Sequence, residues 1–171
     1  MAEAEGGSGG ATVIELAAAA EIARLGLLAE LDAELNLRYP GEPTNGVEAD
    51  GFEDGGGCFV LARRGATPAG CGAFRPADAR TVEIKRMYVR QAHRGHGVAG
   101  RLLEALEGEA RRRGFSRAVL ETGTRQPEAI ALYRRHGYQP IPNFGDYVDL
   151  AFSVCFGKSL GLAATEPGVD R

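Results

Sequence analysis

Apolar side chains recur with two different periods along the chain, and the changes of period predict its first elements. Residues 11–16 form a short apolar run that predicts a strand. Over residues 17–37 the apolar positions return every three or four residues, which predicts one helix. Residues 58–65 and 70–77 are strand-like segments on either side of a turn with Gly and Pro, which predicts a hairpin.

The second half of the chain alternates strands and helices. In order, the pattern predicts a strand at 81–90, a helix from Val98 that ends before Gly114, a strand at 117–123, a helix at 125–138 and a final strand or hairpin at 146–160. A helix between two strands is typical of a parallel crossover, so we expect residues 117–123 to run parallel to residues 86–89. The pattern predicts a single domain at 11–160, with a disordered tail at 1–10 and a flexible one at 161–171.

The strand at 81–90 has a fault in its alternation. Five residues separate the apolar Ile84 from Val89, so simple alternation places them on opposite faces, whereas Met87 and Val89 share a face. One extra residue between Ile84 and Met87, a β-bulge, would restore the pattern. A bulge separates a strand from its neighbour, and such a gap can admit a ligand. A strand buried on both faces is the other interpretation.

Composition narrows the class of protein. With 171 residues, 44% hydrophobic residues and a net charge of −3, the chain has the composition of one soluble domain and no general case for nucleic-acid binding. The acidic residues are concentrated in the first third of the chain. Twelve of them precede Gly57, where the only basic residues are Arg24 and Arg38. The rest of the chain carries 18 basic and 11 acidic residues. The acidic part would suit a cationic substrate and the rest an anionic cofactor, unless both are simply solvated faces.

Location and metal binding follow from a few residue types. Three scattered cysteines without C-x-x-C, and an acidic, Gly-rich start without a leader pattern, indicate the cytoplasm. The alanine-rich segment after it is interrupted by charges, so we expect no membrane span. The three histidines lack metal-ligand spacing, and we expect no metal.

Three glycines in residues 90–106 (RQAHRGHGVAGRLLEAL) spell G-x-G-x-x-G, at Gly95, Gly97 and Gly100. Dinucleotide-binding folds use this spelling, and Glu121 lies about 20 residues further on, where such folds place a ribose-binding acid. Too little chain follows Glu121 for the remaining strands of a doubly wound sheet, and charged residues interrupt the strand before the loop. A nicotinamide-dependent enzyme is therefore the weaker alternative.

The same loop also matches a second motif. Residues Arg94–Ala99 (RGHGVA) resemble the R/Q-x-x-G-x-G/A loop of the GNAT superfamily, the acetyl-CoA-dependent N-acetyltransferases. Residues 126–138 (QPEAIALYRRHGY) are similar to that family's N-x-x-A-x-x-L-Y-x-x-x-G-F/Y helix, with Gln126 where Asn is usual. The matching positions are Ala129, Leu132, Tyr133, Gly137 and Tyr138. The resemblance covers roughly residues 11–160 and, with two spaced motifs in order, is specific.

The resemblance implies an α/β (α+β) fold, a mixed central sheet with splayed parallel fourth and fifth strands flanked by helices. It also implies acetyl-CoA as co-substrate. Glycines let successive backbone N–H groups converge, and the start of the next helix adds its positive dipole end, which suits a pyrophosphate. The expected cofactor-binding residues are Met87, Tyr88, Val89, Arg94, Gly95, His96, Gly97, Val98, Ala99, Gly100, Arg101, Gln126 and Tyr133.

The activity that the resemblance implies is direct acetyl transfer to an amine within a ternary complex. Glu83 is the candidate base, acting directly or through water, although it could equally pair with Lys85, Arg86 or a substrate cation. Tyr133 is the candidate acid for the departing thiolate, with a plain core aromatic as the other interpretation. The backbone of residues 87–89 is expected to pair with the pantetheine arm like an added strand.

The acceptor is expected to be the primary amine of a small molecule, with an amino-acid-like compound as first choice. Acetylation of a protein N-terminus or lysine is an alternative, and a non-catalytic acyl-CoA-binding regulatory module is one of another class. A monomer and a homodimer are both compatible with the sequence. The residues expected at the substrate are Tyr39, Arg75, Glu83, Asn143 and Tyr147, with Glu42 and Phe144 as further candidates.

Overall fold

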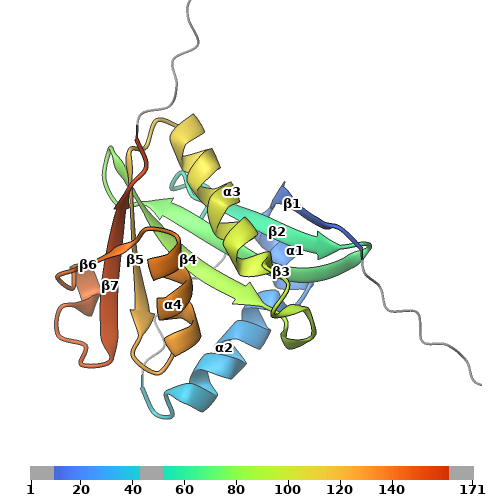
Figure 1. Cartoon of the computed structure of the whole chain (residues 1–171), viewed down its shortest axis with the longest axis horizontal. Helices are drawn as coiled ribbons and strands as arrows, with labels where there is room; N and C mark the ends of the chain where they lie inside the picture. The colour runs from blue at the N-terminus through green and yellow to red at the C-terminus, as the bar shows by residue number, and fades with distance from the viewer. Residues whose placement is uncertain (1–9, 43–51, 162–171) are drawn as a thin grey trace, which may run out of the picture.

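The computed structural model describes residues 10–42 and 52–161. The described residues contain one seven-stranded sheet in the order β1-β2-β3-β4-β5-β7-β6 (Figure 1). Its strands are β1 Thr12–Ala17, β2 Cys58–Arg64, β3 Thr67–Pro76, β4 Thr81–Val89, β5 Arg117–Gly123, β6 Gln139–Ile141 and β7 Ser153–Ser159. The pair β4–β5 is parallel and the other pairs are antiparallel, so the expected mixed sheet is confirmed.

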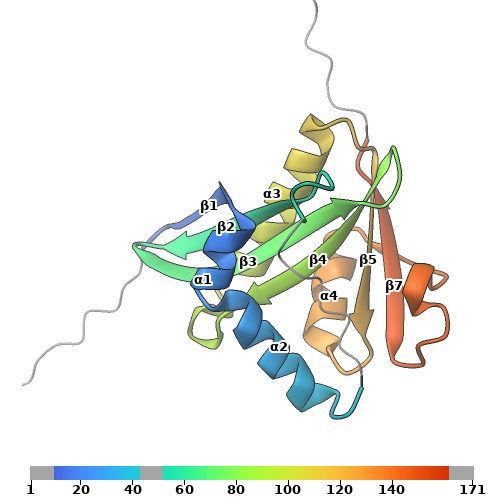
Figure 2. The same cartoon turned by 180° about the vertical axis from the view of Figure 1, so that it is seen from behind.

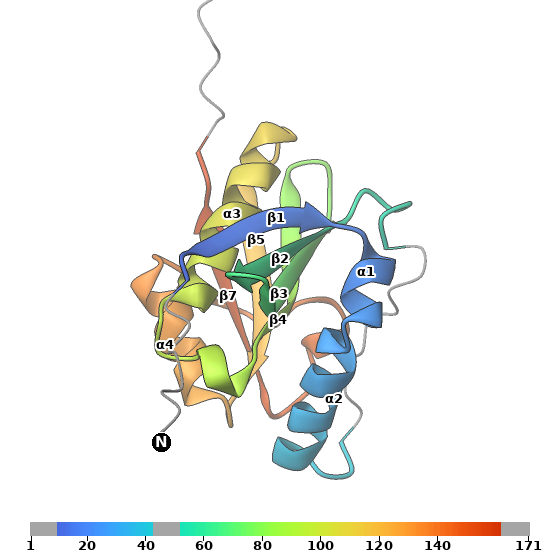
Figure 3. The ribbon, with the colours of Figure 1, turned by 90° about the vertical axis from the view of Figure 1, so that its right-hand side faces the viewer.

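Helices cover both faces of this sheet. Helices α3 (Val98–Arg112) and α4 (Pro127–Arg135) lie on one face, and α1 (Ala19–Arg24) and α2 (Leu27–Arg38) lie on the other (Figures 1, 2 and 3). Two short 3₁₀ turns, η1 (Gln91–His93) and η2 (Gly145–Tyr147), complete the described elements. No helix in these residues is long and apolar enough to cross a membrane. Nearly all of both expected tails, and most of the acidic segment before Phe52, lie outside the described residues.

The prediction of one helix over residues 17–37 was wrong. The segment forms two helices that break at Gly26, whose φ of 79° is left-handed and cannot continue a right-handed helix. The N–H of Gly26 bonds to the carbonyl of Ala23, which ends α1, and α2 then starts at Leu27. The break lets both helices bury apolar side chains, including Ile22 and Leu28, against the same face of the sheet.

The end of the chain also differs in detail from the expectation. The predicted strand or hairpin at 146–160 is a 3₁₀ turn followed by β7, which pairs along its whole length with β5. The sequence did not predict β6, a three-residue strand at the edge of the sheet that contains Pro140. Proline lacks a backbone N–H, so an edge is where a sheet tolerates it.

The expected bulge in β4 is confirmed. Ala73 on β3 pairs with Lys85, whereas Cys71 pairs with Tyr88, so two steps along β3 match three along β4. The extra residue lies at Arg86, whose φ of 58° is unusual for a side chain with a Cβ. The bulge keeps Ile84 in the core while Met87 and Val89 pack at its margin.

The parallel direction and the splay of β4 and β5 are confirmed, but the paired part of β4 lies before residues 86–89. The parallel ladder joins Thr81–Ile84 to Arg117–Leu120, and residues 86–89 have no partner on β5. We call this paired part the closed end of the fork. We call residues 85–89 of β4 with residues 121–123 of β5 its open end.

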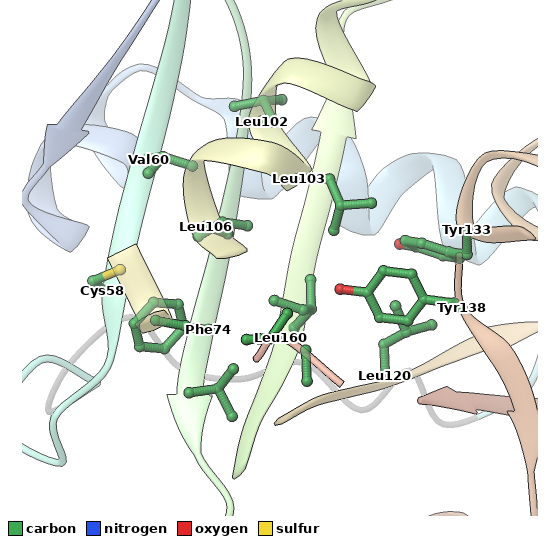
Figure 4. Packing of buried hydrophobic residues seen from close by; sticks show 14 of the residues in the cluster. Cys58, Val60, Phe74, Leu102, Leu103, Leu106, Leu120, Tyr133, Tyr138 and Leu160 are labelled. Atoms are coloured by element: carbon green, nitrogen blue, oxygen red, sulfur yellow. The ribbon is translucent and has the colours of Figure 1, made fainter. Parts of the chain in front are cut away.

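The main core lies between the sheet and helices α3 and α4. Leu102, Leu103 and Leu106 of α3 pack over the sheet, beside Tyr133 and Tyr138 from the α4 region (Figure 4). The two tyrosine rings meet edge to face with centroids 5.8 Å apart. Leu102, Leu103, Leu106 and Tyr138 are at most 1% exposed. The core thus fixes the face of the fork from which α4 approaches.

Candidate active site

A cavity of about 430 Å³ occupies the open end of the fork. Its walls come from β4, β5, the end of α2, the start of α4 and the segment that leads into β7. Figure 2 shows β4 and β5 diverging toward α2, where this cavity lies. The cavity therefore results from the loss of pairing beyond Ile84 and Leu120.

Residues from both faces of the sheet reach this cavity. Ile84 and Leu120 point into the core beneath α3 and α4, so the alternation of the strands places Glu83, Lys85 and Glu121 on the opposite face. Tyr133, from α4 on the core side, also lines the cavity. The open end is thus a passage through the sheet, with an aromatic hydroxyl on one side and charged groups on the other.

Glu83, the predicted base, lies at the closed end and is surrounded by donors. Arg75 donates to Glu83 Oε2 at 3.0 Å, and Lys85 and the Tyr147 hydroxyl donate to Oε1 at 3.2 and 2.6 Å. Glu83 is 4% exposed and does not itself line the cavity, whereas Lys85 and Tyr147 do. Burial opposes ionisation, but the hydrogen bond from Tyr147 and the two cations outweigh it and lower the pKa of Glu83.

Glu121 has the opposite environment. It is the first residue of β5 beyond the parallel ladder, and its carboxylate lines the cavity. The Ser153 hydroxyl donates to Glu121 Oε1 at 2.7 Å, and Oε2 has no hydrogen-bond partner among the described residues. Burial raises the pKa of Glu121 above its usual value, against the effects of Ser153 and Lys85. Of the two glutamates, Glu121 is the one whose carboxylate faces the space for a substrate.

Tyr133, the predicted acid, lies on the core side of the cavity. Its ring is 5% exposed, packs in the core and lines the cavity. Burial first, and then the charge of Glu121, raise the pKa of its hydroxyl well above the usual value of 10. Tyr133 therefore keeps its proton throughout the neutral range and has one to donate. The core interpretation and the functional one are both compatible with this position.

Tyr39 and Gln126 close the end of the cavity next to α4. Tyr39 Oη accepts a hydrogen bond from the backbone N–H of Arg125 at 2.9 Å. Gln126 Oε1 accepts one from the backbone N–H of Gly123 at 3.2 Å, which holds the turn between β5 and α4. A Cβ on Gly123 would lie 1.9 Å from Tyr39 Oη, so only glycine allows this approach. Both predicted residues line the cavity.

The glycine loop lies between the open end of β4 and the start of α3. Gly95 and Gly97 have left-handed φ values of 77° and 75°, and a Cβ on either would meet no atom within 4 Å. Helix α3 starts at Val98 with no side-chain cap and no acid in its first turn. The first amides of a helix lack intrahelical partners and carry partial positive charge. The loop therefore offers an open, positively polarised backbone surface, as a diphosphate requires.

The remaining predicted residues lie apart from the cavity walls. Arg94 donates to the Val89 carbonyl at 2.9 Å and to Glu34 at 2.6 Å, and Arg101 is exposed on α3. Asn143 donates to the carbonyls of Tyr147 and Ser153, so its amide fastens the chain before β7. Among predicted residues, the cavity brings together Tyr39, Glu42, Met87, Gln126, Tyr133 and Tyr147; it does not include Arg75, Glu83, Tyr88, Val89, Asn143, Phe144 or the loop from Arg94 to Arg101.

Sequence reasoning did not assign Lys85, Glu121 or Ser153 to this site, although it named Lys85 as a possible partner of Glu83, a pairing that the structure contains. Lys85 and Glu121 line the cavity, and Ser153 orients Glu121. One signal was present in the sequence: Lys85 and Glu121 are charged residues within strand-like segments. In the structure they follow directly after Ile84 and Leu120, the last pair of the parallel ladder. No cluster of His, Cys, Asp and Glu in the described part of the chain is arranged to hold a metal ion.

Comparison with known proteins places this site in a family context. A profile of the Acetyltransferase (GNAT) family matches residues 18–138, more than half of the chain. An "IAA acetyltransferase" of Azospirillum brasilense is 39% identical over 135 residues, which make up 78% of this chain and 88% of that protein.

Two solved structures extend the comparison. A protein from Klebsiella pneumoniae, provisionally named an acyl-CoA N-acyltransferase, has a TM-score of 0.72 at 32% identity and covers 87% of this chain and 97% of its own. A provisionally named acetyltransferase from Salmonella typhimurium was solved with acetyl-CoA. It has a TM-score of 0.68 at 20% identity, and the match covers 91% of this chain and 97% of that protein. At this lower identity the second similarity is one of fold alone.

Proposed function

Because the chain belongs to the Acetyltransferase (GNAT) family and is therefore an acyltransferase, we propose that it transfers the acetyl group of acetyl-CoA directly to the primary amine of a small molecule. The observation that carries this proposal is the open end of the fork. There a cavity passes through the sheet between the Tyr133 side and the charged residues Lys85 and Glu121. Thioester and amine can approach from opposite faces and meet in the gap.

The glycine loop supports acetyl-CoA as the donor. Its two left-handed glycines and the uncapped start of α3 suit the diphosphate of the coenzyme. The β5 side of residues 87–89 has no strand partner, and apart from the Arg94 side chain on the Val89 carbonyl this edge is open to the amides of a pantetheine arm. The acetyl-CoA present in the Salmonella structure, which has the same fold, agrees with this assignment.

The reaction forms an N–C bond and breaks the C–S bond of the thioester. An alkyl ammonium has a pKa of about 10 and must lose a proton before it attacks. Tyr133 supplies a proton to the leaving thiolate. Glu83, the base expected from the sequence, is separated from the cavity by the hydroxyl of Tyr147, so a role as base would require a relay through that hydroxyl or a water.

Amine-dependent release of free thiol from acetyl-CoA tests this proposal. Purified full-length protein is mixed with acetyl-CoA and a panel of amines, and the acetylated products are identified by mass spectrometry. We expect turnover with at least one small amine. Acetylation of peptides alone would instead favour a protein N-terminus or lysine as the acceptor.

Two glycine variants at opposite ends of α3 test the cofactor assignment. Gly97 and Gly114 both have left-handed φ values, 75° and 89°, and open space around them. Alanine at either position therefore introduces similar backbone strain, about 1 kcal/mol. We expect only Gly97→Ala to raise the KM for acetyl-CoA, about tenfold or more. Equal KM values in the two variants would contradict the assignment, and tight binding of acetyl-CoA with no amine acetylated would favour a regulatory module.

A further inference from the structure

The charges around Glu83 and Glu121 do not cancel, and their imbalance bears on the acceptor. Arg75 and Lys85 both contact Glu83, so this group of three carries one excess positive charge. Glu121, on the other strand of the fork, carries a negative charge whose hydrogen-bond donor among the described residues is the neutral Ser153. The cavity therefore has a positive wall on β4 and a negative wall on β5.

Lys85 is the positively charged residue of the group that lines the cavity. Its side chain is 9% exposed, and Nζ donates to Glu83 at 3.2 Å and to the Tyr147 hydroxyl at 2.6 Å. An ammonium has three N–H donors, so one of them has no partner among the described residues. A buried ammonium that keeps an unused donor and lines a cavity favours an anionic ligand there.

Lys85 and Glu121 do not neutralise each other. No ion pair joins them, although their charges influence each other's titration. The other charged residues of the wall change little: Arg86 pairs with Asp32, and Glu42 and Asp149 are exposed to solvent, which screens them. Two separate, partly buried charges of opposite sign thus face the same space.

We infer that Lys85 and Glu121 select an acceptor that carries both an amine and a carboxylate, with the ammonium at Glu121 and the carboxylate at Lys85. This inference rests on the proposed acetyl transfer and specifies its substrate class as amino acids and related zwitterions. Arg75, one of the residues expected at the substrate, donates to Glu83 and does not line the cavity, so the carboxylate is assigned to Lys85. Glu121 then receives the ammonium and accepts its proton before attack.

Matched substrate pairs test the carboxylate. Each pair consists of an amino acid and the amine that its decarboxylation gives, such as phenylalanine with 2-phenylethylamine. We expect the wild-type protein to prefer the amino acid in kcat/KM by about tenfold or more, as a charge-assisted contact implies. A preference for the decarboxylated amines would overturn the inference.

Variants assign the two charges to their residues. Lys85→Met is expected to lower kcat/KM about 10- to 100-fold for the amino acid and less than about threefold for its partner. Glu121→Gln is expected to lower it for both members of a pair alike, because both carry the ammonium. An equal loss for both members in Lys85→Met would overturn the inference. Thermal melting shows that each variant is folded, and Lys85→Arg, which keeps the charge, should recover part of the preference.

Calorimetric binding separates this inference from the proposed function. Amino acids are titrated into the protein in the presence of CoA, without transfer. Binding that Lys85→Met weakens, with no amine acetylated, would support the zwitterion site and overturn the transferase proposal. Acetylation of amines without any preference for the carboxylate would do the reverse. Neither binding nor acetylation would overturn both.

Discussion

The closed and open ends of the fork are made from the same two strands and have opposite properties. At the closed end, residues 81–84 of β4 are all buried and pair with β5, and residues 82–84 also pair with β3. At the open end, residues 85–89 are only partly buried and keep β3 as their one partner. The bulge at Arg86 lies at the transition. One strand thus contributes packing at one end and a binding edge at the other.

The two glutamates show what this difference does to chemistry. Glu83 at the closed end is held by three donors, and its pKa is lowered, so it stays ionised and structurally engaged. Glu121 at the open end has one donor, and its pKa is raised, so its proton affinity is greater. A group that takes a proton from a substrate needs the second environment. Separation of the strands creates that environment by leaving one side of Glu121 to the cavity.

The largest expected effect on stability comes from the closed end. Leu120→Ala removes a fully buried side chain at the last paired position of the parallel ladder and should lower the free energy of unfolding by about 3 kcal/mol. Met87→Ala, at the open end, removes a partly buried side chain and should cost about half of that or less. Urea denaturation measures both. Equal costs would mean that the two ends do not differ as described.

Substitution of a residue that lines the cavity should lower the rate of acetyl transfer and not the stability. Tyr133→Phe removes the proposed proton donor and should lower kcat about 100-fold, with little change in the KM for acetyl-CoA. The effect should persist across the neutral range, because the raised pKa of Tyr133 keeps it protonated there. Steady-state thiol release at several pH values measures this.

Tyr138→Phe is the matched control for that experiment. Tyr138 is also buried and packs edge to face against Tyr133, but it does not line the cavity. Its kcat should stay within about threefold of the wild-type value. A similar loss in both variants would indicate that packing of the aromatic pair, and not the Tyr133 proton, supports turnover.

Features that depend on neighbouring residues could be predicted from the sequence. The bulge in β4 was predicted because Ile84 and Met87 break the alternation of apolar positions. The glycine loop was predicted from its sequence motif. The break at Gly26 was missed because Leu25 and Leu28 keep helical spacing across it. A single glycine within a helix costs only about 1 kcal/mol, which gives no clear signal.

Features that depend on register could not be predicted in this way. Lys85 and Glu121 share the cavity because Ile84 pairs with Leu120, and nothing local to either strand sets that pairing. The partners of Glu83 illustrate the same limit. Arg75 comes from β3 and Tyr147 from the turn before β7, so the predicted base could be named but its confinement could not.

Substitution of the two glutamates compares the two ends most directly, because the expected effects on stability differ in sign. Glu83→Gln leaves Arg75 and Lys85 without their anion and should lower the free energy of unfolding at pH 7 by about 2 kcal/mol. Since the folded pKa of Glu83 lies below the ordinary value of 4.5, this contribution exists above that pH and is lost as the pH falls through the folded pKa. The difference between variant and wild type should therefore shrink in acid.

Glu121→Gln should instead stabilise the protein at pH 7, by roughly 0.5 kcal/mol, because it removes a carboxylate that burial makes costly to ionise. With a folded pKa above 4.5, the wild-type penalty is absent in acid and grows as the pH rises to the folded value. Denaturation at pH 4 and pH 7 measures both variants. Two destabilising substitutions would mean that Glu121 is held as firmly as Glu83. Opposite signs would indicate that the open end keeps Glu121 ionisable at a cost in stability, as expected of a group that binds and deprotonates an amine.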